Sequence, residues 1–315
     1  MITEQKLSAY FPFSGKIKKR LDQGLSEVFC KYSRTILKKW IINGQVSINN
    51  HIVTNPKKKF LGGELITIQI IVKKNILLSE NIFLNVIYEE DDFLIINKPM
   101  GLIVHPGAGN PNGTLLNALL HRDKIFSHIP RAGIVHRLDK NTTGLILVSK
   151  NINTYNTFVD LLKKREIYRI YEGIVIGRMI SGGTVNAPIG RHRVKRTKMT
   201  VTSIGKSAIT HYRIIERFKN HTHVKIQLET GRTHQIRVHM LHIMYPLVGD
   251  TIYSSCFSTP KNISKELLDY LIRFPRQALH ATSLRFNHPY TKKTMHFNIE
   301  CSKDIKTLIH FLKTK

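Results

Sequence analysis

The chain of 315 residues is poor in acidic side chains. It contains 21 aspartates and glutamates against 49 lysines and arginines, which gives a formal net charge of +28 and a pI near 10.1. Self-repulsion of this size disfavours a compact fold unless a polyanion neutralises it, and nucleic acid is the commonest such partner. An anionic membrane surface ranks below nucleic acid, because the sequence has no long basic amphipathic helix and no lipidation signal.

Cysteines and long apolar runs are also scarce. Cys30, Cys256 and Cys301 lie far apart and form no C-x-x-C pair, which argues against a disulfide framework and against a cysteine zinc site. The first residues lack a basic segment followed by an apolar one, and no apolar stretch reaches the length needed to span a bilayer. We therefore expect a cytoplasmic protein without a membrane partner.

Hydrophobic residues make up 42% of the chain, enough for a sizeable core, and the length suggests one large domain or two. The turn-rich stretch 101–114, "GLIVHPGAGNPNGT", does not match the G-x-G-x-x-G spacing of a dinucleotide site, so we interpret it as a loop.

Residues 14–72 have the pattern of a small α/β unit. Helical spacing over 15–29 is followed by a second helix, for which Ser33 is the predicted N-cap and Gly44 the stop, and then by two alternating strand patterns. Five lysines belong to its expected exposed face: Lys38, Lys39, Lys57, Lys58 and Lys59. Any one of them is best explained as a solvated side chain, but the cluster is at least as consistent with a surface that follows RNA phosphates.

Residues 73–85 lack a clear period and are interpreted as a linker, and a larger domain is expected over 86–315. Its predicted strands outnumber its helices and often follow one another directly. That pattern favours an α+β fold with a largely antiparallel mixed central sheet.

The stretch 133–150, "GIVHRLDKNTTGLILVSK", places Asp139 between two apolar runs, 132–135 and 145–148, which we expect to be buried strands. A turn capped by Asp139 or Thr142 would be the simplest explanation. Against it, the cationic neighbours Arg137 and Lys140 would keep the carboxylate ionised and nucleophilic, and they could also receive a phosphate.

The stretch 229–250, "ETGRTHQIRVHMLHIMYPLVGD", contains His234, His239 and His242, but their spacing is not that of a zinc helix and no metal is expected. Arg237 lies among residues that look half-buried and so needs a carboxylate partner, for which Asp139 is the candidate. Tyr171, in a predicted strand, is either a core residue or a platform on which a base stacks.

The chain resembles the RluA-type family of pseudouridine synthases along nearly its whole length. The matching segments are "NKPMGLIVHP", "HRLDKNTTGLILVSK", "REIYRIYEGIV", "LETGRTHQIRVHM" with "PLVGDTIY", and "QALHATSLRFNHP". The segment "SRTILKKWIINGQVSINN" is similar to the signature of an S4 RNA-binding domain.

The resemblance implies a pseudouridine synthase fold behind an S4-like domain and the isomerisation of uridine to pseudouridine without metal or organic cofactor. The implied partner is large-subunit (23S) ribosomal RNA or a pre-50S particle, at the loop closing helix 69, and we expect a monomer. The matched positions make Asp139 the catalytic aspartate, as nucleophile at C1′ or as base at C2′.

Four further roles follow from the same match. Arg237 would pair with the aspartate, Tyr171 would stack on the target base, Arg137 would fill the gap left by the flipped base, and Leu279 would line the pocket. Glu229 and Asp250 would be structural. The alternative is a non-catalytic RNA-binding or ribosome-assembly protein, for which the S4-like unit and the net charge would suffice.

Overall fold

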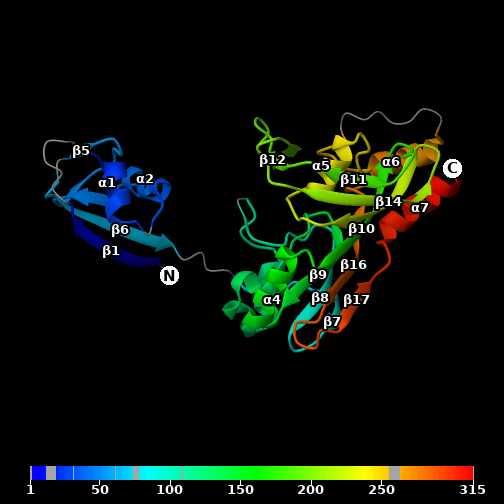
Figure 1. Cartoon of the computed structure of the whole chain (residues 1–315), viewed down its shortest axis with the longest axis horizontal. Helices are drawn as coiled ribbons and strands as arrows, with labels where there is room; N and C mark the ends of the chain where they lie inside the picture. The colour runs from blue at the N-terminus through cyan, green and yellow to red at the C-terminus, as the bar shows by residue number, and fades with distance from the viewer. Residues whose placement is uncertain are drawn as a thin grey trace. The chain divides into compact units, whose positions relative to one another are not determined.

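The computed structural model describes residues 2–11, 19–30, 32–60, 62–73, 78–107, 109–254 and 263–314. The chain divides into two compact units, Met1–Leu77 and Leu78–Lys315 (Figure 1). The division falls within the stretch 73–85 that the sequence suggested as a linker.

The smaller unit packs two helices, α1 (Leu21–Val28) and α2 (Arg34–Ile42), on a four-stranded antiparallel sheet. The sheet order is β1 (Ile2–Tyr10), β6 (Leu65–Lys73), β3 (Val46–Ile48) and β4 (His51–Ile52), and β2 (Lys19–Arg20) pairs separately with β5 (Lys59–Phe60). Ser33 caps α2 as predicted, because its Oγ accepts a hydrogen bond from the N–H of Ile36, and Gly44 follows the helix with a φ of 71°.

Two features of this unit differ from the sequence-based expectation. The first helix begins only at Leu21, after the short strand β2, while residues 14–18 lie outside the described part of the chain. The unit also includes β1, which precedes residue 14 and pairs with β6 along its whole length. Because the residues of β1 pair with residues of β6 some sixty positions away, the local sequence does not indicate this strand.

The larger unit is built on a nine-stranded mixed sheet, as its α+β pattern predicted. The order is β11 (Gly183–Asn186), β14 (Ile209–Arg217), β15 (His221–Leu228), β10 (Tyr168–Ile176), β16 (Leu279–Asn287), β9 (Thr143–Ser149), β8 (Phe93–Lys98) and β7 (Val86–Glu89), with β17 (Thr294–Asn298) paired to β16. The pairs are antiparallel except for β9 with β16. A small ribbon, β12 (Ile189–Arg191) with β13 (Met199–Val201), stands apart.

Helices cover both faces of the sheet (Figure 1). They are α3 (Leu115–Arg122), α4 (Ile152–Lys163), α5 (Gln235–His242), α6 (Lys265–Arg273) and α7 (Lys303–Thr314), with the short 3₁₀ helices η1 (Lys124–His128) and η2 (Pro130–Gly133). In β8, Phe93 and Ile95 pack in the core that includes Phe158 of α4, whereas Leu94 and Ile96 pack in the core formed with α3. Burial on both faces explains why β8 and β9 appear in the sequence as unbroken apolar runs.

The apolar run 132–135 is not the strand that we expected. Its first two residues, Ala132 and Gly133, belong to η2, inside which Arg131 and Ala132 have φ of 55° and 51°. Within the run only Ile134 makes an isolated bridge, to Val148 of β9. Gly133 explains the close approach, because a Cβ at this position would lie 2.0 Å from the carbonyl oxygen of Ser149. The run is buried by packing against β9 rather than by strand pairing.

Candidate active site

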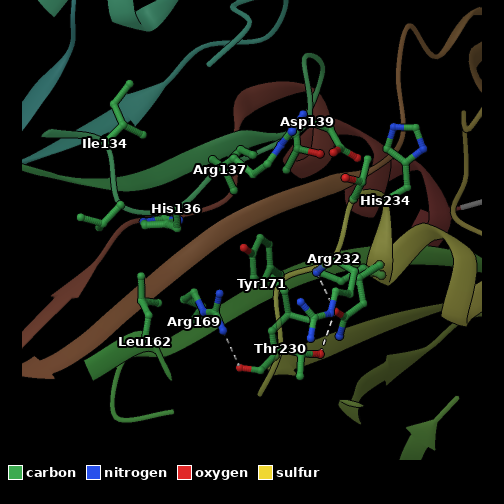
Figure 2. A pocket seen from close by; sticks show the side chains of 18 of the residues that line it. Ile134, His136, Arg137, Asp139, Leu162, Arg169, Tyr171, Thr230, Arg232 and His234 are labelled. Carbon is green, nitrogen blue, oxygen red and sulfur yellow. Dashed lines mark hydrogen bonds between the residues drawn. The ribbon is translucent and has the colours of Figure 1, made fainter. Parts of the chain in front are cut away.

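A pocket of about 970 Å³ opens in the larger unit, and all five residues that the motifs singled out for chemistry line it. They are Asp139, Tyr171, Arg237, Arg137 and Leu279. Figure 2 labels three of them, Asp139, Tyr171 and Arg137, among the side chains that line the pocket. They come from the loop before β9, from β10, from α5 and from the start of β16, so the sheet and one helix bring together segments up to 142 positions apart.

Asp139 lies in a turn, but the turn uses its backbone. Its carbonyl oxygen accepts a hydrogen bond from the N–H of Thr142 at 3.1 Å, while its carboxylate, with the side chain 16% exposed, reaches into the pocket. Oδ2 of Asp139 accepts a hydrogen bond from Nη1 of Arg237 at 3.1 Å. Asp139 can therefore stabilise a turn and also act in the pocket, because the turn uses its backbone carbonyl and the pocket uses its carboxylate.

Arg237 is the cation that contacts Asp139, rather than the sequence neighbours Arg137 and Lys140, which are exposed. Its guanidinium also forms a two-pronged bridge to Asp250, with Nε 2.7 Å from Oδ2 and Nη2 2.8 Å from Oδ1. Burial alone would lower the pKa of Arg237, but the carboxylates of Asp250 and Asp139 outweigh it and raise that pKa further. Arg237 therefore stays charged.

Asp250 is the residue whose importance the sequence did not reveal. Its side chain is inaccessible to solvent, and besides Arg237 it accepts hydrogen bonds from the N–H groups of Ile252 and Tyr253 at 3.1 and 3.2 Å. Asp250 binds Nε and Nη2 of the Arg237 guanidinium, which leaves Nη1 to donate to Asp139. A lone acid in the apolar stretch "YPLVGD" was the available signal.

Tyr171 and Leu279 form neighbouring parts of the pocket wall. Tyr171 is 5% exposed on β10, where it pairs with Ile226 and Ala281, and Leu279 is 3% exposed at the start of β16. Burial raises the pKa of Tyr171 to about 12, against the effect of the nearby Arg169, so the phenol stays neutral at physiological pH.

Lys98 supports the loop that carries Asp139. Its side chain is fully buried at the end of β8, and Nζ donates to the carbonyl oxygens of Pro99, Leu102 and Lys140 at 2.8, 2.9 and 2.9 Å. Burial lowers its pKa to about 7. The segment "NKPMGLIVHP" contains this lysine, but the sequence does not show that the side chain reaches the residue after Asp139.

The histidines of the third motif make protein contacts. His234 shares a 2.9 Å hydrogen bond with the hydroxyl of Tyr253, and His239 bonds to Thr210 and to the carbonyl oxygen of Ala187. Within the described residues, the side-chain groups close enough to hold a metal lie elsewhere: Glu172, His223 and Cys301, and Glu90, Asp92 and His288.

The five lysines of the smaller unit are all exposed. Lys38 and Lys39 lie on α2, and Lys57, Lys58 and Lys59 lie in the turn before β5 and at its first residue. In the described part of the chain, no helix combines the length and the apolar character that crossing a membrane requires.

Comparisons with known proteins agree on one family. The model of the RNA pseudouridylate synthase family matches residues 92–242, and that of the S4 domain matches residues 19–66. The chain is 54% identical over 317 residues to ribosomal large subunit pseudouridine synthase D of Buchnera aphidicola subsp. Schizaphis graminum, covering 98% of this chain and 99% of that one. It is 48% identical to the protein of the same name from Escherichia coli K12, covering 95% and 92%.

Solved structures show the same fold. Human RNA pseudouridylate synthase domain containing 4 has a TM-score of 0.56 at 25% identity and covers 73% of this chain and 93% of its own. Human RNA pseudouridylate synthase domain containing 1 has a TM-score of 0.53 at 22% identity, with 75% and 97% covered, which supports the fold alone.

Proposed function

Because the chain belongs to the family of RNA pseudouridylate synthases, we propose that it isomerises specific uridines of 23S ribosomal RNA, free or in a pre-50S particle, to pseudouridine. The relatives named above are large-subunit rRNA enzymes by name and match almost every part of this chain. The proposed target is the loop that closes helix 69, and the proposed setting is the cytoplasm, with the protein acting as a monomer.

The observation that carries the chemistry is the Asp139–Arg237 pair inside the pocket. In the proposed reaction the bond between N1 of the uracil and C1′ of the ribose breaks, the uracil turns within the pocket, and C5 forms a bond to C1′. C5 then loses its proton and N1 gains one, so the product is an isomer of the substrate. Asp139 acts on the sugar, at C1′ as nucleophile or at C2′ as base. Arg237 fixes the orientation of that carboxylate, and a pocket with little water strengthens their pairing.

The remaining pocket residues are proposed to handle the base. The target must leave the RNA stack, which costs a few kcal/mol. Arg137, an exposed residue of the pocket lining, is suited to fill the gap left in the RNA. Tyr171 offers a buried aromatic face for the uracil, and Leu279 an apolar wall.

We further propose a division of labour between residues 14–72, which contact the RNA backbone, and residues 86–315, which perform the chemistry. Its support is the match of the S4 model to 19–66 and the exposure of Lys38, Lys39, Lys57, Lys58 and Lys59. Binding through phosphates falls steeply with salt.

Replacement of Asp139 tests the proposal. We expect Asp139→Asn to abolish pseudouridine formation while RNA binding survives, because the amide keeps the shape of the side chain but cannot attack or take a proton. The measurement is chemical probing of pseudouridines in 23S rRNA from cells that lack the gene, complemented with the parent or the variant. Asp91→Asn, in the exposed turn before β8, is the matched control. Modification at the parental rate by the Asp139 variant would show that the catalytic assignment is wrong.

A further inference from the structure

Within the described residues, three arginines are almost completely buried, and one of them lacks a carboxylate partner. Arg237 is paired with Asp250 and Asp139, and Arg276 is bridged to Asp304 through Nε and Nη2. Arg169, 7% exposed on β10, forms no ion pair with any residue that the structure describes. A buried charge without a partner costs several kcal/mol, so its presence calls for an explanation.

The protein itself satisfies Arg169 poorly. Nη2 makes two long hydrogen bonds, 3.5 Å to the carbonyl oxygen of Leu228 and 3.3 Å to that of Glu229. Nε is buried and has no hydrogen-bond partner. Nη1 lies over Gly231, where a Cβ would come within 2.9 Å of it. Gly231 thus leaves room for the guanidinium of Arg169, and the acceptors around it are neutral carbonyl oxygens.

Arg169 lines the same pocket as Asp139. In Figure 2 it lies with Leu162 and His136 toward one end, with Tyr171 between it and Asp139. His136 contributes a second unsatisfied donor there. Its Nε2 accepts a hydrogen bond from the N–H of Leu147 at 2.9 Å, so in the neutral ring the proton is on Nδ1, which is buried without a partner.

We propose that this end of the pocket is a phosphate subsite, in which Arg169 binds an RNA phosphate next to the target uridine. The inference rests on the proposed function, since it takes RNA as the substrate. A uracil carbonyl would satisfy hydrogen bonds but not the charge, whereas a phosphate does both and matches the guanidinium fork. The pocket, at about 970 Å³, is at the upper end of the size range of ligand pockets and so has room for a group beyond the base.

The test measures binding with turnover removed. In an Asp139→Asn background, the dissociation constant is determined for an RNA hairpin with the helix 69 loop sequence and for hairpins with one neutral methylphosphonate at each phosphate flanking the target. We expect one methylphosphonate to weaken binding about ten- to a hundredfold, which is the range for one charged hydrogen-bond contact. Adding Arg169→Gln should weaken binding of the unmodified hairpin by a similar factor and remove the sensitivity to that methylphosphonate.

Arg285→Gln is the matched control, because Arg285 is exposed on β16, stacks on Tyr168 and does not line the pocket. It should keep the parental sensitivity to the methylphosphonate. Arg169→Lys, which keeps the charge but not the fork, should fall between parent and Arg169→Gln, and it serves as the test variant if the glutamine variant does not fold. The inference is overturned if the Arg169 variants stay as sensitive to every methylphosphonate as the parent. Because the readout is binding, failure of Asp139 as the catalytic residue would leave this result unchanged.

Discussion

At the scale of single residues, the pocket depends on Arg237, whose guanidinium is paired with two carboxylates. Asp250 takes the Nε–Nη2 edge of Arg237, and Nη1 is left for Asp139. Asp250 is 1% exposed and therefore cannot exchange this partner for water. The orientation of the proposed catalytic carboxylate is thus set from a residue that never touches it.

We expect Asp250→Asn to lower both stability and turnover. Removing one partner of a buried ion pair costs about 3–5 kcal/mol. Loss of the fork would also let Nη1 of Arg237 drift from Asp139, and misplacement of this kind reduces turnover about 10²-fold. Urea unfolding and single-turnover pseudouridine formation measure the two effects.

Asp269→Asn, exposed on α6, is the control for the loss of one acid. A variant at position 250 with parental stability and parental turnover would show that Arg237 does not need Asp250.

At the scale of elements, the end of β8 and the loop before β9 are joined through one lysine. Nζ of Lys98 has three carbonyl acceptors, and the third belongs to Lys140, next to Asp139. Backbone groups of two segments some forty positions apart thus share one donor. The strand holds the loop in place, and the loop in turn holds Asp139.

We expect Lys98→Met to destabilise the larger unit by about 1–3 kcal/mol for each carbonyl left buried without a donor, and to slow turnover because the loop is released. Methionine retains most of the volume, so the change isolates the hydrogen bonds. The measurements are urea unfolding and single-turnover kinetics. Lys140→Met, which removes an exposed ammonium from the same loop, should leave stability nearly unchanged. Equal stability of the two variants would contradict the role of Lys98.

At the scale of the whole molecule, buried and half-buried histidines make stability depend on pH. Burial lowers the pKa of His105, His221 and His280 to about 4 and that of His136 to about 3, from an ordinary value of 6.5. Between these values and 6.5 the unfolded chain binds more protons than the folded one. Their contribution to stability is therefore complete above pH 6.5 and is lost as the pH falls toward 4.

We expect the free energy of unfolding of the larger unit to fall between pH 7.5 and pH 5, by up to about 1.4 kcal/mol per pH unit for each histidine within its window. Urea titrations at the two pH values measure it. His221→Gln should reduce the dependence on pH, whereas His128→Gln, at an exposed position, should not. A free energy of unfolding that does not change over this range would contradict the prediction.

Much of the architecture was accessible from the sequence because it depends on local patterns. The α+β class followed from strands that succeed one another, and the cap of α2 followed from Ser33 and its spacing. The sequence indicated Asp139, Arg237 and Tyr171 because each lies in a motif of a few consecutive residues, which can be recognised without knowledge of the fold. The strand expected at 132–135 was wrong because an apolar run records burial, and burial here comes from packing against β9.

The sequence by itself determined the residue types available for chemistry, their order along the chain and the local structure around each. Apart from the pairing of Arg237 with Asp139, which the sequence suggested, only the tertiary structure decided which of them meet. The bridge from Asp250 to Arg237, the reach of Lys98 to the loop of Asp139, and the lack of a carboxylate partner for Arg169 among the described residues depend on where the sheet brings distant segments together. The physical reason is that an ion pair or hydrogen bond depends on separation in space, whereas the sequence records only separation along the chain.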